Sequence, residues 1–405
     1  MDLMALAYAM MLALGGVALD AYQNPKSMVV EVIAPGANTT PSLDRRFISV
    51  VVQGEIDRAV KVRSLITRPN IRPSGDKSTI ETIAEALGGG ALVTAFADLT
   101  ATPPSRLKIG LFNENDKPAV FVTGVQQSMF LHDMHFDNLL YQEPNETVVH
   151  LIKRAAMDGV AQIDPYLAML YLLQEARWKN DDRYAKEALR VSARVARQLP
   201  KGRASLLARL TNLEGLVHLQ RRDLELARTT FLRGIEYLPD QRGPIRAVLN
   251  MNIAFIEIAQ GDPDSAANRL AILLAPDGLL AEDTVFTTTT SDGKALVLGD
   301  EETRFLRSTG LMLSGCAALA RNDLDGAERF GRQALEISPT RLTALSLLAD
   351  IAERRGDAAE AARLRASIVD LQFTADPYME TANAFATLAL GGPAPKVNPS
   401  LYIFY

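Results

Sequence analysis

The chain has 405 residues, of which 48% are hydrophobic and 22% charged, and its formal net charge is −5 at neutral pH. This composition is typical of globular chains and excludes a wholly disordered protein, while the length allows two or three domains. The negative charge argues against nucleic acid as a partner. The single cysteine, Cys316, excludes an intrachain disulfide and a multi-cysteine metal site.

The first segment in chain order is apolar. Residues 3–19 contain no charged side chain and are bounded by Asp2 and Asp20. A helix of this length is at the lower limit for crossing the hydrocarbon core of a bilayer. Residues 1–20 therefore predict a membrane anchor or signal segment. A cleaved signal peptide and a buried helix are the alternatives, although a cleaved signal normally begins with basic residues.

A small α+β domain is predicted over residues 27–160. β-Branched runs indicate strands, apolar periodicity indicates helices, and Ser78 with Glu81 forms a capping box. Residues 69–75 hold two prolines and a glycine and predict a loop. The expected order is strand 28–33, helix 42–66, helix 78–88, strands 91–101, 106–112 and 119–123, and helix 145–157.

A helical array is predicted over residues 164–372, followed by a capping helix and tail at 373–405. Residues 275–303 interrupt the array as a surface loop or short hairpin, because they are too many for an inter-helix turn. The expected helix pairs are 165–198, 205–237, 245–273, 303–336 and 341–370.

Small residues recur at fixed spacings in this array. Gly215 and Gly315 are each followed by an alanine 12 residues later, a small residue 19 later and a proline 24 later. Small residues at these offsets let antiparallel helices approach closely, and proline ends the second helix. The positions that carry the pattern are Gly215, Ala227, Phe231, Gly234 and Pro239, then Gly315, Ala327, Ala334 and Pro339, with Gly261, Ala266, Gly356 and Ala361 at matching sites.

This pattern resembles tetratricopeptide repeats, although the large aromatic residue of that family's first helix is missing. The resemblance implies a mainly α fold, an α-solenoid in which stacked pairs form a surface that binds a protein partner. A second segment, residues 83–95 with 106–112, is similar to TolB-like N-terminal domains, which are often fused to such repeats in bacterial membrane proteins. That resemblance implies a protein of the bacterial envelope.

No motif in the sequence indicates an enzyme or a cofactor. A Gly-x-Ser-x-Gly elbow is absent, and the chain holds four histidines. One alternative is a metal-dependent enzyme that uses His132, His135 and Asp137, which would meet on one face if this stretch were helical. A polar surface turn between a strand and a helix is the simpler interpretation of the same residues.

The main hypothesis is a membrane-anchored envelope scaffold that recruits a protein partner through a repeat groove. It places the chain in the bacterial inner membrane as a single-pass protein, with the bulk in the periplasm. Basic residues between Arg190 and Arg222 would suit an acidic peptide. Polar positions on first helices are expected to line the concave side and contact the partner, namely Arg209, Asn212, His218, Asn250, Asn252 and Arg307.

Two further alternatives concern the α+β domain and the tail. The α+β domain would be a sensor if it bound a small molecule or anion through Arg68 and Arg72 and the repeats relayed its occupancy. The apolar run 401–405 would produce a homo-oligomer if it added as a strand to the sheet of a second copy.

Overall fold

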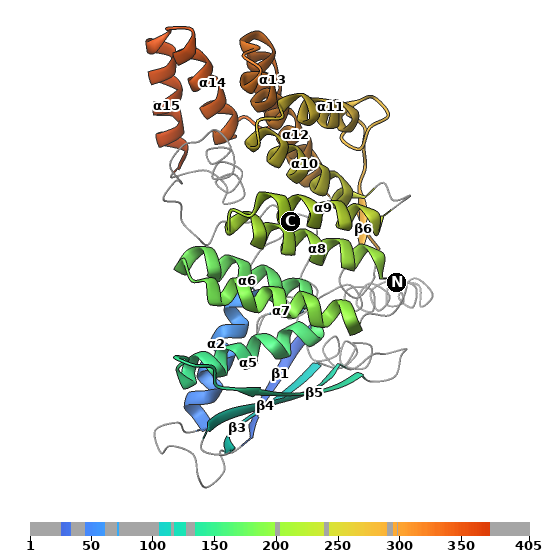
Figure 1. Ribbon diagram of the computed structural model, residues 1–405, viewed down its shortest axis with the longest axis vertical. Coiled ribbons are helices and arrows are strands. Elements are labelled where there is room, and N and C mark those ends of the chain that lie inside the picture. The colour runs from blue at the N-terminus through green and yellow to red at the C-terminus, as the bar shows by residue number, and fades with distance from the viewer. Residues whose placement is uncertain are drawn as a thin grey trace, which may run out of the picture. The chain divides into compact units, whose positions relative to one another are not determined.

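A computed structural model describes part of the chain, in two compact units (Figure 1). Of the described residues, those up to 168 belong to one unit and those from 169 onward belong to the other. The described residues are 26–33, 45–60, 71–72, 105–114, 117–126, 134–198, 203–238, 243–289, 295–297 and 299–372. The domain boundaries expected from the sequence stay predictions.

Several expected segments lie outside the described residues. They are the apolar segment 3–19, the helix 78–88, the strand 91–101 and the tail 373–405. Among the helices that are described, none combines the length and apolar character needed to cross a membrane.

The first unit contains a mixed sheet in the order β2-β1-β3-β4-β5. β1 is parallel to β2 and β3, whereas β3–β4 and β4–β5 are antiparallel. The strands are β1 (Lys26–Ile33), β2 (Ile71–Arg72), β3 (Ser105–Glu114), β4 (Lys117–Gln126) and β5 (Met134–Tyr141).

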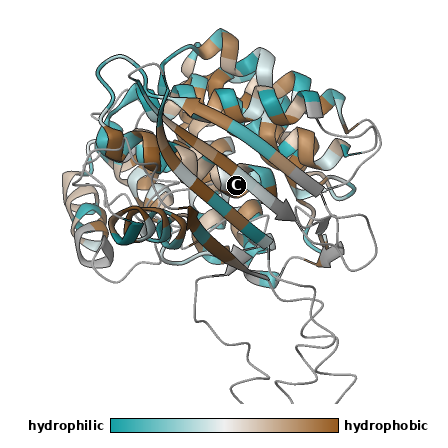
Figure 2. Cartoon of the chain, turned by 90° about the horizontal axis from the view of Figure 1, so that it is seen from below, coloured by the Kyte–Doolittle hydropathy of each residue, from teal (hydrophilic) through white to brown (hydrophobic). Residues whose placement is uncertain are grey.

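Helices α2 (Arg45–Val60) and α5 (Val148–Ile163) pack against the sheet and against each other. Leu107 and Ile109 of β3 are fully buried, while Lys108 between them is exposed, as the period of a strand requires. Figure 2 shows this alternation of apolar and polar residues along the strands. α5 approaches β3 closely, since a Cβ on Gly159 would lie 2.4 Å from Leu107.

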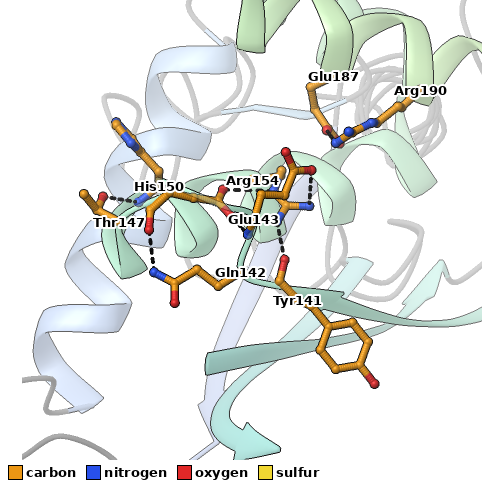
Figure 3. A network of polar contacts seen from close by, with 9 residues as sticks. Tyr141, Gln142, Glu143, Thr147, His150, Arg154, Glu187 and Arg190 are labelled. Carbon is orange, nitrogen blue, oxygen red and sulfur yellow. Dashed lines mark hydrogen bonds and ion pairs between the residues drawn. The ribbon is translucent and has the colours of Figure 1, made fainter. Parts of the chain in front are cut away.

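Polar contacts fix the two helices in this unit. The buried carboxylate of Glu55 on α2 lies 3.7 Å from Nζ of Lys153 on α5. The Arg154 guanidinium donates to the Tyr141 carbonyl oxygen at 2.6 Å and pairs with Glu146 at 2.8 Å (Figure 3). Arg154 therefore joins the end of β5 to α5. A second ion pair in Figure 3, Glu187 with Arg190, lies within one helix of the other unit.

The structure confirms the expected strands at 28–33, 106–112 and 119–123. It also confirms the expected helices at 42–66 and 145–157, which are observed as α2 and α5. Two expectations were wrong. Residues 71–72 were assigned to a loop but form β2. Residues 134–137 were assigned to a turn, or to a helix for metal binding, but belong to β5. His, Asp and Asn residues, which are common in this stretch, have a low intrinsic preference for strands. Pairing with β4 along the whole of β5 overrides that low preference.

From Pro165 onward the described chain forms five helix pairs, as predicted, and successive pairs stack as helical repeats. The hairpin β6 (Thr287–Thr289) with β7 (Ala295–Val297) lies in the predicted interruption. The pairs are α6 (Pro165–Lys179) with α7 (Asp182–Gln198), α8 (Ala204–Gln220) with α9 (Leu224–Glu236), α10 (Pro244–Ala259) with α11 (Pro263–Leu274), α12 (Asp300–Ala320) with α13 (Leu324–Ile337), and α14 (Leu342–Arg354) with α15 (Ala358–Gln372).

All five pairs share one turn between their helices. A residue with positive φ ends the first helix, and the aspartate after it donates its N–H to the carbonyl five residues earlier, at 2.8–3.0 Å. This is the hydrogen bond that closes a Schellman motif. The residue pairs are Asn180-Asp181, Arg222-Asp223, Gly261-Asp262, Asn322-Asp323 and Gly356-Asp357.

The same aspartate begins the second helix. Its side chain accepts a backbone N–H from the first turn, as Asp223 does from Leu226 at 3.1 Å and Asp323 from Gly326 at 2.9 Å. Four residues after each aspartate stands a buried alanine, at 185, 227, 266, 327 and 361. The turn thus ends one helix, caps the next and places a small residue where the two helices meet.

The pairs stack through both of their helices, and the second helix of each pair makes the larger share of the contact with the next pair. α10 contacts both α8 and α12, and α12 contacts α14, while each second helix packs on the first helix of the next pair. The interruption also packs on this layer, since Leu280 is buried and a Cβ on Gly310 of α12 would lie 2.7 Å from it. Phe286, just before the hairpin, is fully buried.

We expect Asp323→Ala to lower the free energy of unfolding by about 1 kcal/mol, because the first turn of α13 loses its capping acceptor. Asp323→Asn retains an acceptor and should lose much less. Urea unfolding followed by far-UV circular dichroism measures both variants. An alanine variant as stable as the parent would contradict the capping role.

We expect Gly215→Ala to destabilise the helical unit by about 1–3 kcal/mol, because the new methyl group would lie 2.3 Å from the buried Phe231 ring. Gly54→Ala on α2 is the matched control. A Cβ there meets nothing within 4 Å, so the change should stabilise α2 by about 0.5–1 kcal/mol. Thermal unfolding of both variants should show shifts of opposite sign.

Candidate functional site

The structure places three of the predicted partner-binding residues inside the repeat packing. On α8, Arg209 is 1% exposed and Asn212 is fully buried, and His218 in the last turn is also buried. The Arg209 Nε donates to the Ser205 carbonyl oxygen at 3.3 Å. Side chains buried to this extent offer little surface to a partner, and their contact with one stays a prediction.

The other three predicted residues lie in different surroundings. Asn252 on α10 donates from Nδ2 to Oδ1 of Asn212 on α8 at 2.8 Å, so this pair joins adjacent first helices. Arg307 on α12 lies with Nη2 3.9 Å from Glu282 in the interruption. Asn250 alone among the six lines a groove. The six residues therefore do not form one site.

The groove has a volume of about 840 Å³ and is open to solvent. Its floor is α10, its two walls are α9 and α11, and one end is formed by the turn after α11. The side chains that matter for its chemistry are Arg228, Arg246, Asn250, Glu257, Ser265, Asn268, Arg269, Ile272, Asp277 and Leu279.

The groove follows from how the helix pairs stack. α10 packs on α8 and α12 through its apolar face, and α9 and α11 both pack on α10. The two second helices make at most sparse contact with each other within the described residues. The face of α10 between them carries polar side chains. The groove thus lies on the side of the second helices, whereas the sequence placed the partner on the first helices.

A buried ion pair forms the floor. Arg269 on α11 donates from Nη2 and Nε to the two carboxylate oxygens of Glu257 on α10, at 2.7 and 3.1 Å. Its Nη1 donates to Oδ1 of Asn250 at 3.1 Å, and Asn250 donates from Nδ2 to the Arg246 carbonyl oxygen at 2.8 Å. Glu257 is 3% exposed, so its charge is held in place by this two-pronged contact.

The walls combine charge, hydrogen-bonding groups and an apolar rim. Ser265 and Asn268 of α11 are exposed, and Ile272 on the same helix is 72% exposed. Arg246 donates from Nη1 to the Leu238 carbonyl oxygen at the end of α9.

Arg228 contributes its charge near the start of α11. Hydrogen bonds from Ser265 hold the pKa of Asp262 below its ordinary value, and the positive charge of Arg228 lowers that pKa further. Among the described residues, Arg228 makes this electrostatic contact and no close ion pair. Its guanidinium is therefore available to a ligand.

This arrangement is suited to binding. The described groove holds guanidinium groups, amides, a hydroxyl and an apolar rim, which can offer a ligand hydrogen bonds, positive charge and apolar contact. The described residues hold no cluster of three metal-ligating side chains. The metal hypothesis requires His132, His135 and Asp137 to lie on one helix. His135 and Asp137 lie in the strand β5, so that requirement is wrong for these two residues, and His132 lies outside the described residues.

Sequence reasoning missed most of the groove. Glu257 and Arg269 stand 12 residues apart on different helices, and only the turn at Asp262 brings them together. Arg228 lies on α9 and Arg246 on α10, which belong to successive helix pairs, so no spacing within one pair relates them. Two of the basic residues that the sequence singles out make ion pairs away from the groove. Arg190 pairs with Glu187, and Arg221 lies 3.2 Å from Asp182.

Comparison with known proteins gives a distant likeness. No family model and no curated protein matches the chain. A solved structure titled "MamA RS-1 ArsTM double mutant" is 15% identical, with a TM-score of 0.33 over 53% of this chain and 97% of its own. Another, titled "MamA MSR-1 C2", is 14% identical, with a TM-score of 0.30 over 51% and 97%. At these values neither carries an argument, so the repeats are identified from their shared turns and stacking.

We expect stability to fall as the pH is lowered from 7.5 to 5.5, in part because of His218. Burial lowers the pKa of His218 although Glu214 and Asp223 lie nearby, so the unfolded chain takes up the proton first. The loss begins near the unfolded pKa of about 6.5 and ends below the folded pKa. His218→Gln should reduce the pH dependence of urea unfolding in this window. An unchanged slope would contradict this contribution.

Proposed function

We propose that this protein is a scaffold that binds a segment of a partner protein in the groove between α9, α10 and α11. The observation that supports this proposal is the groove itself, which is open to solvent and carries the exposed amide of Asn268 and the exposed side chain of Ile272 on a stack of helices. Repeat stacks of this kind commonly present such surfaces to extended or helical peptides.

Rigidity favours recognition here. The floor side chains are fixed by the Arg269–Glu257 pair, and the walls belong to helices that begin at capped aspartates. A surface that is ordered before binding loses little conformational entropy when it binds a ligand, so modest contacts suffice for affinity.

The setting of the scaffold remains a set of predictions from the sequence. They are the anchor at 3–19, a place in the bacterial inner membrane with the bulk in the periplasm, the TolB-like resemblance, the sensor hypothesis and homo-oligomer formation. Arg68 of the sensor hypothesis lies outside the described residues, and Arg72 lies in β2. The expectation that the chain has no enzymatic activity also stays a prediction.

Asn268→Trp tests the proposed surface. The residue is exposed on the α11 wall, so an indole there would occupy part of the groove and obstruct a ligand. Gln333→Trp on α13 is the matched control, because this glutamine is exposed outside the groove. The readout is the protein that co-purifies with the tagged full chain from its native cells, quantified by mass spectrometry.

We expect a stoichiometric partner with the parent and with Gln333→Trp, and its loss by at least about tenfold with Asn268→Trp, since filling a binding pocket removes the contacts that depend on it. Equal recovery with all three chains would show that the groove is not the binding surface. Absence of any stoichiometric partner would contradict the scaffold function.

A further inference from the structure

We propose that one face of the sheet in the first unit is the interface of a homodimer, in which two copies pack sheet against sheet about a two-fold axis that runs across the strands. The face in question, called the far face below, is opposite the face on which α2 and α5 pack. This inference concerns a different surface from the groove and does not depend on the proposed function.

The far face follows from the alternation of side chains along each strand. Leu107 of β3 points toward α5, because a Cβ on Gly159 of α5 would lie 2.4 Å from it. The residues on either side of Leu107 therefore point away from α5, and the strand register extends this face to the neighbouring strands. Its residues are Val29, Glu31 and Ile33 of β1, Arg106, Lys108, Gly110, Phe112 and Glu114 of β3, Lys117, Ala119, Phe121 and Thr123 of β4, and Asp137, Leu139 and Tyr141 of β5.

An apolar band crosses the middle of the far face. It consists of two adjacent cross-strand rows, which are Ile33, Gly110, Phe121 and Leu139 in one and Phe112, Ala119 and Tyr141 in the other. Ile33 is 42% exposed, Leu139 37% and Tyr141 46%. A sheet face that stays in water normally carries polar residues, and a continuous apolar band indicates an interaction surface.

Tyr141 flattens one side of this band. Its hydroxyl donates to Oε2 of Glu114 at 2.6 Å, and its ring points away from α5 (Figure 3). The register places Ala119 between the strands of these two residues, and Ala119 is fully buried. The ring therefore lies across β4 and presents an apolar surface, while its hydroxyl holds the Glu114 carboxylate at the border of the band.

Charged residues border the band on both sides, with opposite signs on each strand. On β3, Lys108 stands two residues before the band and Glu114 two residues after it. Asp137 of β5 stands on the Lys108 side, and Lys117 of β4 stands on the Glu114 side. Nζ of Lys108 lies 3.3 Å from Glu31, and both side chains are about half exposed. An ammonium group has three N–H donors, so this contact leaves Lys108 able to bind a second carboxylate.

This pattern is complementary to itself under a two-fold rotation. An axis that runs across the strands, between the two apolar rows, exchanges those rows and reverses the strand direction. Lys108 then faces Glu114 of the second copy, and Asp137 lies diagonally across from Lys117 of the second copy. Each of these contacts occurs twice, as an interface between identical patches requires. Stacked sheets keep their strands within about 30° of each other, so the long lysine side chains can reach these carboxylates.

The area of the far face is sufficient for a weak dimer. Four strands about 4.8 Å apart and about eight residues long, at about 3.4 Å per residue, cover roughly 500 Å² on each copy. The total of about 1,000 Å² lies at the lower limit of specific protein interfaces. Affinity in the micromolar range follows from such an area. At this size the charges around the band decide which surfaces associate, because like charges placed opposite each other are strongly unfavourable.

Sedimentation velocity of the purified full chain over the micromolar range tests the inference. We expect the parent to dimerise. Lys108→Glu and Glu114→Lys should each raise the dissociation constant by about tenfold or more, because each places two like-charge contacts in the dimer. Arg45→Glu is the matched control, since it also reverses an exposed positive charge but lies on α2, on the opposite side of the sheet, and should change nothing.

Mixing the two variants makes the test specific. In a mixed dimer of Lys108→Glu with Glu114→Lys, both contacts between positions 108 and 114 join opposite charges. The mixture should therefore dimerise within about threefold of the parent although each variant alone is weakened. Recovery on mixing also shows that both variants fold, since an unfolded chain has no sheet to pair. Leu139→Arg, which leaves the ion pairs intact and charges the apolar band, should give a monomer with the far-UV circular dichroism of the parent.

The outcomes decide the inference either way. A monomeric parent overturns it, and so does a dimer that Lys108→Glu, Glu114→Lys and Leu139→Arg leave unchanged, because that dimer uses another surface. Weakened variants that do not recover on mixing contradict the proposed two-fold arrangement. Recovery on mixing, together with a monomeric Leu139→Arg and an unchanged Arg45→Glu, supports the far face as the interface.

Discussion

The helical unit depends on one turn, used in each of its described pairs. A residue with positive φ reverses the chain, and the aspartate after it bonds backward through its N–H and forward through its side chain. Because both helix ends are satisfied within a few residues, the two helices must leave the turn antiparallel and at a fixed separation. The buried alanine four residues later keeps that separation short.

The groove is a consequence of this geometry. Second helices held tightly against their own partners do not close over the face of α10, so Arg246 and Asn250 on that face stay partly exposed. Glu257 shows the connection most directly, because its carbonyl oxygen accepts the N–H of Asp262 in the turn while its carboxylate binds Arg269 in the floor. The same residue thus helps to end a helix and to order a binding surface.

The α+β unit is held by different means. A sheet with alternating burial packs on α2 and α5, and the close approach at Gly159 lets α5 lie directly on Leu107. Charged groups at the helix junctions, Glu55 with Lys153 and Arg154 with Glu146, fix the helices where apolar packing alone would allow them to slide. The unit needs long-range pairing of strands, whereas the repeats are built from contacts between neighbours in sequence.

This difference explains what the sequence by itself determined. Helix pairs were predictable at all five places, because apolar periodicity, small residues and turn residues act over a few positions. The sequence also carries a second mark of each turn, an aspartate followed four residues later by an alanine, as at Asp323 and Ala327. Strand β5 was not predictable, because only its pairing with β4 offsets the weak strand preference of His135 and Asp137. The groove was decided by tertiary structure alone. Arg228, Arg246, Glu257 and Arg269 have no common spacing, and they meet because three helices stack around one polar face.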